Sequence, residues 1–417
     1  MPHDVKYAWT ALTLSVAAAF GPAPDILAGE PSPPPAEAGL ADRLAPPVSG
    51  LAPGESGSST PFDLSALSSA SSPPGAPQEK KKDGEFFVAP LPFANPTLGW
   101  GLGAMAGYIF RVDPDDTISP PTLLGVTGFY AENGSWGGGL GGMTYLDEDR
   151  WRLMGGLAAG RMRFDFSGVG AEAGRENGSL PLDIDFRGFL LQGMGRVVPH
   201  MYAGLRGLFG RITTRVDTTD LGSPAGGFLS GKTWASDDAA LGLRLQVDTR
   251  DSTFYPTRGV LLDIICDLHN KALGDDFNYE IEELSANGYI RLAEGHVLAL
   301  RGYGRYASAD APFFALSFLG RGADLRGYAV GQYQDRLLLD VQAEYRVELG
   351  WRLGATAFAG IGTVAPNLGD IDGGDLFPSG GVGLRYTVAP ENHVNLRTDF
   401  AWGKEGFVFY LGVGEAF

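Results

Sequence analysis

The sequence predicts an all-β fold class, a 16-stranded antiparallel transmembrane β-barrel with an inward-folded long loop, preceded by a disordered linker. Segments in which apolar and polar residues alternate follow one another from residue 85 to residue 417. A long run of such strands, with no helix to cover the apolar face, is typical of a closed barrel whose outside meets lipid. The 62 glycines and 24 phenylalanines among 417 residues suit strands with tight bends and aromatic girdles at the membrane interfaces.

Residues 1–28 have the pattern of a secretory signal peptide. Basic residues precede an apolar run at residues 7–20, and small residues follow it. Cleavage after Ala19 and cleavage after Ala28 both fit this pattern. No later stretch approaches the roughly 20 continuous apolar residues that a transmembrane helix requires, so we expect the mature protein to cross a membrane as strands.

Residues 29–84 predict a disordered linker on the periplasmic side. They are rich in Pro, Ser, Ala and Gly and hold few large apolar side chains. Such a segment cannot bury enough surface to offset the entropy lost when a chain becomes ordered. The barrel is therefore expected to occupy residues 85–417.

The strands of the barrel are expected in an even number, which lets both ends of the chain lie in the periplasm. We place them at residues 86–94, 98–110, 122–131, 135–147, 150–162, 183–196, 199–210, 236–248, 258–269, 277–292, 295–306, 334–349, 351–362, 379–388, 392–402 and 406–417. The longest connections all lead from an odd to an even strand, whereas most of the others are short. This asymmetry is that of bacterial barrels, with long extracellular loops and short periplasmic turns.

The alternation also predicts which side chains face the lumen. It is clearest at residues 334–349, where charged and amide side chains share one parity and apolar side chains the other. The ionisable side chains assigned to the lumen are Asp340, Glu344, Arg346, Arg385, Arg397 and Asp399. Opposite charges among them are expected to form ion pairs, because a lumen excludes much of the water that would otherwise solvate them.

The first and last strands have features of a weak seam. Pro90 and Pro92 remove two backbone donors from the first strand, and Gly412 and Gly414 soften the last. The last strand also places several apolar residues and Phe417 on one parity, a pattern similar to the terminal signal by which outer-membrane barrels are recognised for assembly.

Several classes of function are not expected. The net charge of −17 argues against a nucleic-acid partner, because phosphate binding needs clustered Lys and Arg. Asp220, Asp237 and Asp238 show no spacing typical of a catalytic or metal site, and the five histidines (His3, His200, His269, His296 and His393) are scattered. We therefore expect no enzyme activity, no metal and no cofactor. The single cysteine, Cys266, is expected to be a small apolar residue, buried or facing lipid.

A family resemblance appears in the long loop after the eleventh expected strand. The run Gly320-Arg321-Gly322-Ala323-Asp324-Leu325-Arg326-Gly327-Tyr328 resembles the Arg-Gly-Tyr/Phe motif of the BamA/TamA-type superfamily, also called bacterial surface antigens. A second similarity lies at an expected periplasmic turn, where the residues are Asp248, Arg250, Asp251 and Gly259. The resemblance covers residues 85–417.

The resemblance implies that the loop folds into the barrel and that Arg326, followed by Gly327 and Tyr328, is anchored in the lumen. Glu344 is the acidic partner it implies, together with Asp340. A second acid, expected in a Phe-x-Asp-x-Gly pattern, is replaced by Gly360. The linker also departs from members of the superfamily that carry soluble POTRA domains, so the chain is similar to the short members without them.

The resemblance implies an outer-membrane protein of a Gram-negative-type bacterium that assists insertion or translocation of a protein or lipid substrate. Its expected partners are outer-membrane lipid, an unfolded outer-membrane or secreted protein, and the barrel-assembly machinery of the cell. Two alternatives stay open: a plugged pore or channel for small solutes or lipid, and a structural barrel exposed at the surface.

Overall fold

The computed structural model describes residues 84–417 except for residues 96–97, 167–168, 173–179, 217–232, 313–314, 321–324, 329–331 and 405. The expected signal peptide and nearly all of the expected linker, residues 1–83, lie outside the described residues. No helix in the described part of the chain is long and apolar enough to cross a membrane.

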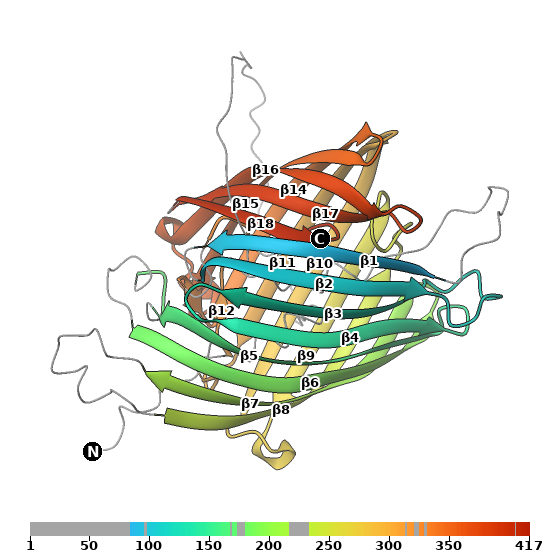
Figure 1. The fold of residues 1–417 in the computed structure, drawn as a ribbon. Helices are drawn as coiled ribbons and strands as arrows, with labels where there is room; N and C mark the ends of the chain where they lie inside the picture. Colours follow the sequence, from blue (N-terminus) through green and yellow to red (C-terminus); the bar gives the residue numbers. More distant parts are fainter. Residues whose placement is uncertain are drawn as a thin grey trace, which may run out of the picture.

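Sixteen antiparallel strands form one sheet in chain order, which confirms the predicted all-β, 16-stranded antiparallel barrel. In Figure 1, β1 to β8 form the near wall of the barrel and the strands from β9 to β14 pass behind them. The strands are β1 (Glu85–Asn95), β2 (Gly99–Phe110), β3 (Thr122–Ala131), β4 (Trp136–Leu146), β5 (Trp151–Phe166), β6 (Leu180–Val198), β7 (Met201–Val216), β8 (Thr233–Asp248), β9 (Gly259–His269), β10 (Tyr279–Ala293), β11 (His296–Ala307), β14 (Leu337–Gly350), β15 (Leu353–Ala365), β16 (Leu376–Ala389), β17 (Val394–Gly403) and β18 (Gly406–Val413).

The connection from β11 to β14 contains a second, two-stranded sheet. It consists of β12 (Ser317–Phe318) and β13 (Gln334–Asp335). Short 3₁₀ helices are η3 (Lys271–Leu273), η5 (Leu368–Asp370) and η6 (Gly373–Asp375). We call the end of the barrel at which β1 begins the turn end, because most connections there are short, and the opposite end the loop end.

The strands from β5 to β8 extend further toward the loop end than the sequence predicted. β6 begins at Leu180 and β8 at Thr233, before the expected residues 183 and 236. β5 continues to Phe166 and β7 to Val216, beyond the expected ends at residues 162 and 210. These extensions carry ion pairs to β6: Arg163 of β5 lies 3.3 Å from Asp183, and Arg215 of β7 lies 2.6 Å from Asp185. An ion-paired extension lacks the apolar parity that marks a strand inside a membrane, so the alternation could not reveal it.

The alternation of exposed and buried side chains follows the prediction on β14. Glu344 and Arg346 are almost completely buried, whereas Val341 is 57% exposed and Leu349 is 62% exposed. The same parity holds on β9, where Asp263 and Ile265 are buried. Cys266 is partly exposed and has the opposite parity, so it lies on the outer face.

Ion pairs between neighbouring strands line the inner wall of the barrel. Arg244 of β8 contacts Asp263 of β9 at 2.7 Å, and Arg305 of β11 contacts Glu283 of β10 at 3.1 Å. Each pair offsets the cost of placing a charge where little water reaches it. The inward face is therefore polar but closely balanced in charge at these positions.

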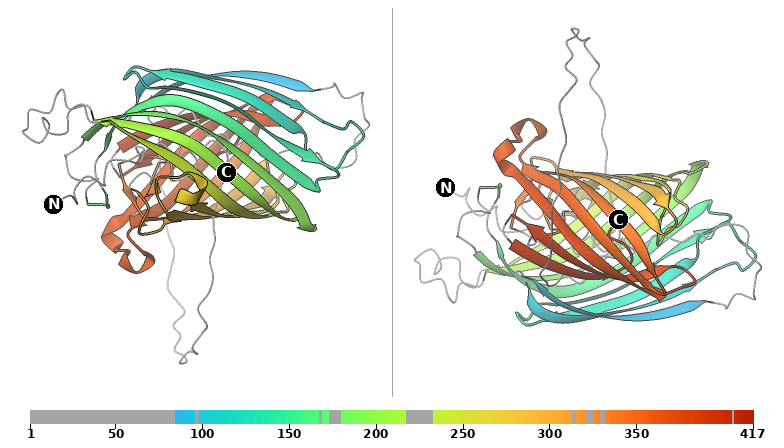
Figure 2. Two further views of the ribbon diagram at one scale, coloured as in Figure 1. Left: turned by 90° about the horizontal axis from the view of Figure 1, so that it is seen from below. Right: turned by 90° about the horizontal axis from the view of Figure 1, so that it is seen from above.

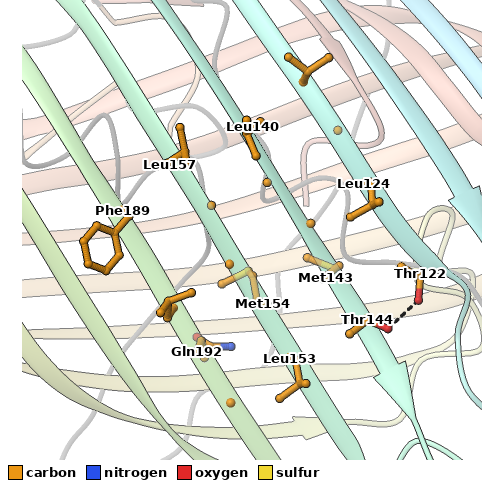
Figure 3. Close-up of a pocket in the computed structure, with 18 of the residues that line it drawn as sticks. Thr122, Leu124, Leu140, Met143, Thr144, Leu153, Met154, Leu157, Phe189 and Gln192 are labelled. Carbon is orange, nitrogen blue, oxygen red and sulfur yellow. Dashed lines mark hydrogen bonds between the residues drawn. The ribbon is translucent and has the colours of Figure 1, made fainter. Parts of the chain in front are cut away.

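The outer wall from β1 to β8 is apolar and hollowed. A hollow of about 1250 Å³ lies across these strands, and Figure 3 shows Leu124, Leu140, Leu157 and Phe189 among the residues that line it. Glycines face one another across β4 and β5 at its centre, and small residues there leave the wall thin. The outward leucines form the apolar surface that a barrel in lipid requires.

Candidate functional site: the seam between β1 and β18

The two end strands of the sheet, β1 and β18, lie side by side without forming a ladder. Figure 1 shows β18 running beside β1, and the views in Figure 2 show the sheet curling until its two ends meet. Among the described residues, the two strands are not paired in the sheet, whose order begins with β1 and ends with β18. We call this boundary the seam.

The prolines of β1 account for part of this missing ladder. Pro90 pairs in register with Ala104 of β2, and Pro92 pairs with Leu102. A proline has no N–H group. It is therefore tolerated where the backbone nitrogen points to the free edge of a sheet, but not where a neighbouring strand needs an N–H donor. The edge that faces β18 therefore lacks two donors, as expected from the sequence.

An apolar cluster inside the barrel holds the seam instead. Phe87, Ala89 and Leu91 of β1 are buried in it together with Val394 of β17 and Val413 of β18. One polar contact crosses the same boundary, because the Asn392 amide donates to the Glu85 carboxylate at 2.6 Å. Side chains thus join the two ends of the sheet near the turn end.

The turn between β8 and β9 reaches this cluster from the far side of the sheet. Phe254, in the middle of the turn, is buried in the same cluster as Phe87 and Val413. The ring of its neighbour Tyr255 stacks on the His393 ring, with centroids 4.0 Å apart and planes 2° apart. We call residues 249–258 the cross-barrel turn, since they connect the β8–β9 wall to the seam.

The motif residues of the sequence hold the cross-barrel turn in shape. Arg250 binds both carboxylate oxygens of Asp248, at 2.9 and 3.0 Å. Asp251 accepts hydrogen bonds from the backbone N–H groups of Thr257 and Arg258, at 2.8 and 3.1 Å. Gly259 has φ +103°, and a Cβ there would lie 2.3 Å from the Thr249 carbonyl oxygen, so the position requires glycine.

A second group of residues lies on the inner side of the last strands. It contains three arginines and three carboxylates, all almost completely buried. We call it the lumen cluster; its members are Arg326, Arg346, Arg385, Glu344, Asp399 and Glu415.

Arg326 lies at the centre of the lumen cluster. Its Nη2 is 2.7 Å from Glu344 Oε2, and its Nη1 is 2.6 Å from Asp399 Oδ2. The contact with Glu344 is an ion pair that does not meet hydrogen-bond angles, whereas the contact with Asp399 is also a hydrogen bond. The guanidinium also lies 3.5 Å from the centre of the Phe358 ring, which suits a cation–π contact.

The expected anchor Asp340 is not a partner of Arg326. Asp340 accepts a hydrogen bond from the Gln342 amide at 2.9 Å, and Asp399 of β17 takes the expected place beside Glu344. Asp340 precedes Glu344 by four residues on an extended strand, about 13 Å along β14, so one guanidinium cannot reach both. The position of Gly360 leaves no room for an aspartate side chain, because a Cβ there would lie 2.7 Å from Gln342 Cγ and 3.1 Å from Leu325 Cδ1.

The two residues after Arg326 bind β18 and β16. Gly327 N–H donates to the Tyr410 hydroxyl of β18 at 2.8 Å, and its φ of +111° favours glycine. The Tyr328 hydroxyl donates to the Pro378 carbonyl oxygen of β16. Residues 325–328 are buried against inward side chains of the barrel, and the rest of the motif, residues 320–324, is described only at Gly320.

The comparisons with known proteins agree with this geometry. Residues 210–417, which include the cross-barrel turn and the lumen cluster, match the family model described as Omp85 superfamily domain. The chain carries an Omp85 superfamily domain. No curated protein matches the sequence.

Solved structures of low sequence identity share the fold of this chain. It is similar to BamA from Haemophilus ducreyi lacking POTRA domains 1–3, with TM-score 0.51, 17% identity, and cover of 79% of this chain and 70% of that one. It is also similar to CdiB from Acinetobacter baumannii, with TM-score 0.50, 12% identity, and cover of 78% and 58%. For CdiB from Escherichia coli the values are 0.51, 10%, 78% and 60%.

The end of the Omp85 domain differs from the sequence prediction. β18 ends at Val413, and Gly414 adopts φ +87°, so the chain turns inward and does not continue as a strand to residue 417. Glu415 then binds Arg385 at 2.7 Å, and the Phe417 carbonyl oxygen accepts from Arg346 at 2.6 Å. Phe417 therefore lies among inward arginines and not on the outer apolar face. Glu415 breaks the apolar pattern because it belongs to the lumen cluster.

Gly412 has a specific packing role on β18. It pairs in register with Arg397 of β17, and a Cβ on Gly412 would lie 2.9 Å from Arg397 Nε. Glycine thus leaves room for a lumen arginine beside the seam.

The structure also brings together three residues that the sequence did not connect. Asp238, His269 and Asp275 lie at the loop end, with their ligand-type atoms within 4.8 Å of one another. One feature of the sequence could have indicated this contact. If β8 and β9 are paired outward from the turn between them, His269 lies opposite Ala240. Asp238 is two residues from Ala240 on β8, so it lies on the same inward face next to His269.

Proposed function

We propose that this Omp85 protein assists the insertion or translocation of a protein substrate at the outer membrane, and that the substrate enters at the seam. The observation that supports this proposal is the absence, among the described residues, of a backbone ladder between two end strands that lie side by side. A strand edge in lipid is costly while its N–H and C=O groups are unpaired. An incoming strand can supply those partners.

The contacts that hold the seam suit opening and closing. The apolar cluster of Phe87, Leu91 and Val413 and the pair between Asn392 and Glu85 are side-chain contacts. Breaking them leaves fewer unpaired backbone groups than breaking a continuous ladder of hydrogen bonds. The seam is therefore the part of the barrel wall that opens at the lowest cost.

The lumen cluster gives β18, the edge that stays in place, a rigid support. Arg326 and its two carboxylate partners join β14 and β17 through the loop segment 325–328, and Gly327 continues the contact to β18. Strand β18 is thus held from inside while its outer edge stays without a ladder. This arrangement supports a seam that opens by movement of β1 relative to the last strands.

The alternative of a wide passive pore has less support. The described part of the lumen contains the buried lumen cluster and the inward-turned residues Glu415 and Phe417. Such a lumen suits a plugged barrel better than a broad aqueous channel. Lipid as the transported substrate stays an alternative, because the outer hollow across β1 to β8 is apolar.

The test is the insertion of an unfolded outer-membrane barrel into liposomes that contain the refolded protein. We expect faster insertion than into empty liposomes, and the acceleration should be lost in Arg326→Ala, because the support for β18 is gone. Liposomes that contain an unrelated porin serve as the control for bilayer defects. An insertion rate equal to that of the porin liposomes would contradict the proposal.

A further inference from the structure

A compact group of three polar side chains lies at the loop end of β8 and β9, away from the seam. His269 Nδ1 is 2.9 Å from Asp238 Oδ1 and 3.1 Å from Asp275 Oδ2. Asp238 belongs to β8, His269 ends β9, and Asp275 follows η3 in the connection to β10. All three side chains are buried, with side-chain exposures of 3% or less.

The charge balance of this group differs from that of other buried carboxylates. Asp263 is paired with Arg244, Glu283 with Arg305, and the acids of the lumen cluster with three arginines. Among the described residues, Asp238 and Asp275 have His269 as their only basic ion-pair partner. Two buried carboxylates beside one imidazole leave an excess of negative charge, which is costly unless a cation is shared.

The neighbouring groups hold these side chains in fixed orientations. The His269 ring stacks on Tyr279, with centroids 4.1 Å apart and planes 13° apart. Asp275 Oδ1 accepts from the Phe277 N–H at 2.6 Å, and Oδ2 accepts from the Ala239 N–H at 3.0 Å. Metal ligands are typically oriented by outer contacts of this kind.

We propose that Asp238, His269 and Asp275 bind a divalent transition-metal ion, with zinc as the preferred ion. One imidazole nitrogen and two carboxylate oxygens form a donor set that zinc accepts, whereas an imidazole donor disfavours calcium and magnesium. Zinc bonds of about 2.0–2.2 Å in tetrahedral geometry hold ligand atoms about 3.3–3.6 Å apart. The observed 2.9 and 3.1 Å are a few tenths of an ångström shorter than the lower end of that range, so the three side chains would move apart slightly to admit the ion.

The metal would join three segments of the loop end. It would connect β8, β9 and the β9–β10 connection at a place where strand pairing ends, since His269 pairs in register with Ala240 and Asp275 lies beyond the strand. Three protein ligands leave one position for water. Because this group lies apart from the seam, zinc binding and seam function can be tested separately.

The test uses the full chain, refolded in detergent after treatment with a chelator. Zinc is added in a calorimetric titration, and bound metal is counted by elemental analysis after dialysis. We expect one zinc ion per chain and a rise in Tm on zinc addition, because a ligand that binds only the folded state stabilises it. A cobalt(II) titration gives an absorption spectrum that reports the coordination directly.

The variants separate this site from adventitious binding. Asp275→Asn keeps the shape of the side chain, and we expect it and His269→Ala to raise the Kd for zinc by at least about 100-fold. The matched controls are His296→Ala, at an exposed histidine that contacts the Tyr345 hydroxyl, and Asp237→Asn, at the exposed neighbour of Asp238. Both controls should bind zinc as the wild type does.

Two results would overturn the proposal. One is a wild-type chain that binds no zinc, in which case the three side chains form only an ion-paired cluster. The other is Asp275→Asn binding zinc with wild-type affinity. If His269→Ala fails to refold, Asp275→Asn and the cobalt spectrum of the wild type still decide the question.

Discussion

Arg326 is the residue on which the interior of the last strands depends. Its guanidinium is completely buried and contacts Glu344 at 2.7 Å and Asp399 at 2.6 Å. Glu344 and Asp399 depend on the positive charge of Arg326 and of the guanidiniums beside it, Arg346, Arg385 and the equally buried Arg397. Removing one charge therefore leaves another without compensation in a place where water cannot solvate it.

We predict that Arg326→Ala lowers the free energy of unfolding by about 3–5 kcal/mol. The measurement is urea unfolding in vesicles, followed by tryptophan fluorescence. The matched control is Arg150→Ala, because Arg150 pairs with Asp147 at 2.8 Å while both side chains are more than half exposed. An exposed pair contributes about 1 kcal/mol or less, so equal losses in the two variants would contradict this assignment.

For single residues, the sequence predicted which side chains face the lumen but not which of them form ion pairs with one another. Strand parity placed Glu344, Arg346 and Asp399 in the lumen, because alternation needs only neighbours along the chain. It could not show that Arg326 binds Asp399 and not Asp340, since that depends on where a loop segment docks. Likewise Asp238 and His269 meet only because β8 and β9 pair across a turn.

The cross-barrel turn is the element that connects the two sides of the barrel. Phe254 is 2% exposed and lies in the cluster that joins β1 to β17 and β18. The sequence identified the turn through Asp248, Arg250, Asp251 and Gly259, which shape it. The apolar residues in its middle carried no periodic signal, so their contact with the seam was not predictable.

We predict that Phe254→Ala loosens the seam. Truncating a buried phenylalanine costs about 3–5 kcal/mol, and here the lost contacts are those between β1 and the last strands. Hydrogen exchange should become faster at the amides of β1 while those of β10 and β11 stay protected. Leu368→Ala, at a side chain that is 70% exposed, is the control, and an equal effect there would argue against a specific role of Phe254.

The stack between Tyr255 and His393 makes the cross-barrel turn sensitive to pH. Burial lowers the pKa of the His393 imidazole below its ordinary 6.5, although Glu348 and Glu415 oppose this shift. The unfolded chain then binds more protons than the folded chain in the range just below 6.5, so stability falls as the pH drops through that value.

We therefore predict that the wild type loses more stability between about pH 7.5 and about pH 5.5 than His393→Phe does. Phenylalanine keeps an aromatic ring against Tyr255 and does not titrate. Thermal unfolding of both proteins across this range gives the difference directly. The same pH dependence in both proteins would show that His393 does not contribute.

At the scale of the whole molecule, the number of strands and their order followed from the sequence, but the ends of the sheet did not. Sixteen strands could be counted because an alternation of apolar and polar residues recurs along the chain. The predicted ends of β5 and β7 fell short where ion-paired residues such as Arg163 and Arg215 follow. The inward turn after Val413 depends on Gly414 and on the arginines that receive Glu415. Those arginines lie on other strands, so a local pattern could not indicate the turn.

The proposed function requires the seam between β1 and β18 to open. The most direct measurement is the insertion assay with the seam locked, using Ala89→Cys and Val413→Cys in a Cys266→Ala background. Both new thiols lie in the apolar cluster that joins the two ends of the sheet, and a short bifunctional thiol reagent would connect them. We predict that the cross-linked protein loses its acceleration of insertion and that either single-cysteine variant, treated identically, keeps it. Full acceleration by a protein shown to be cross-linked would contradict the account.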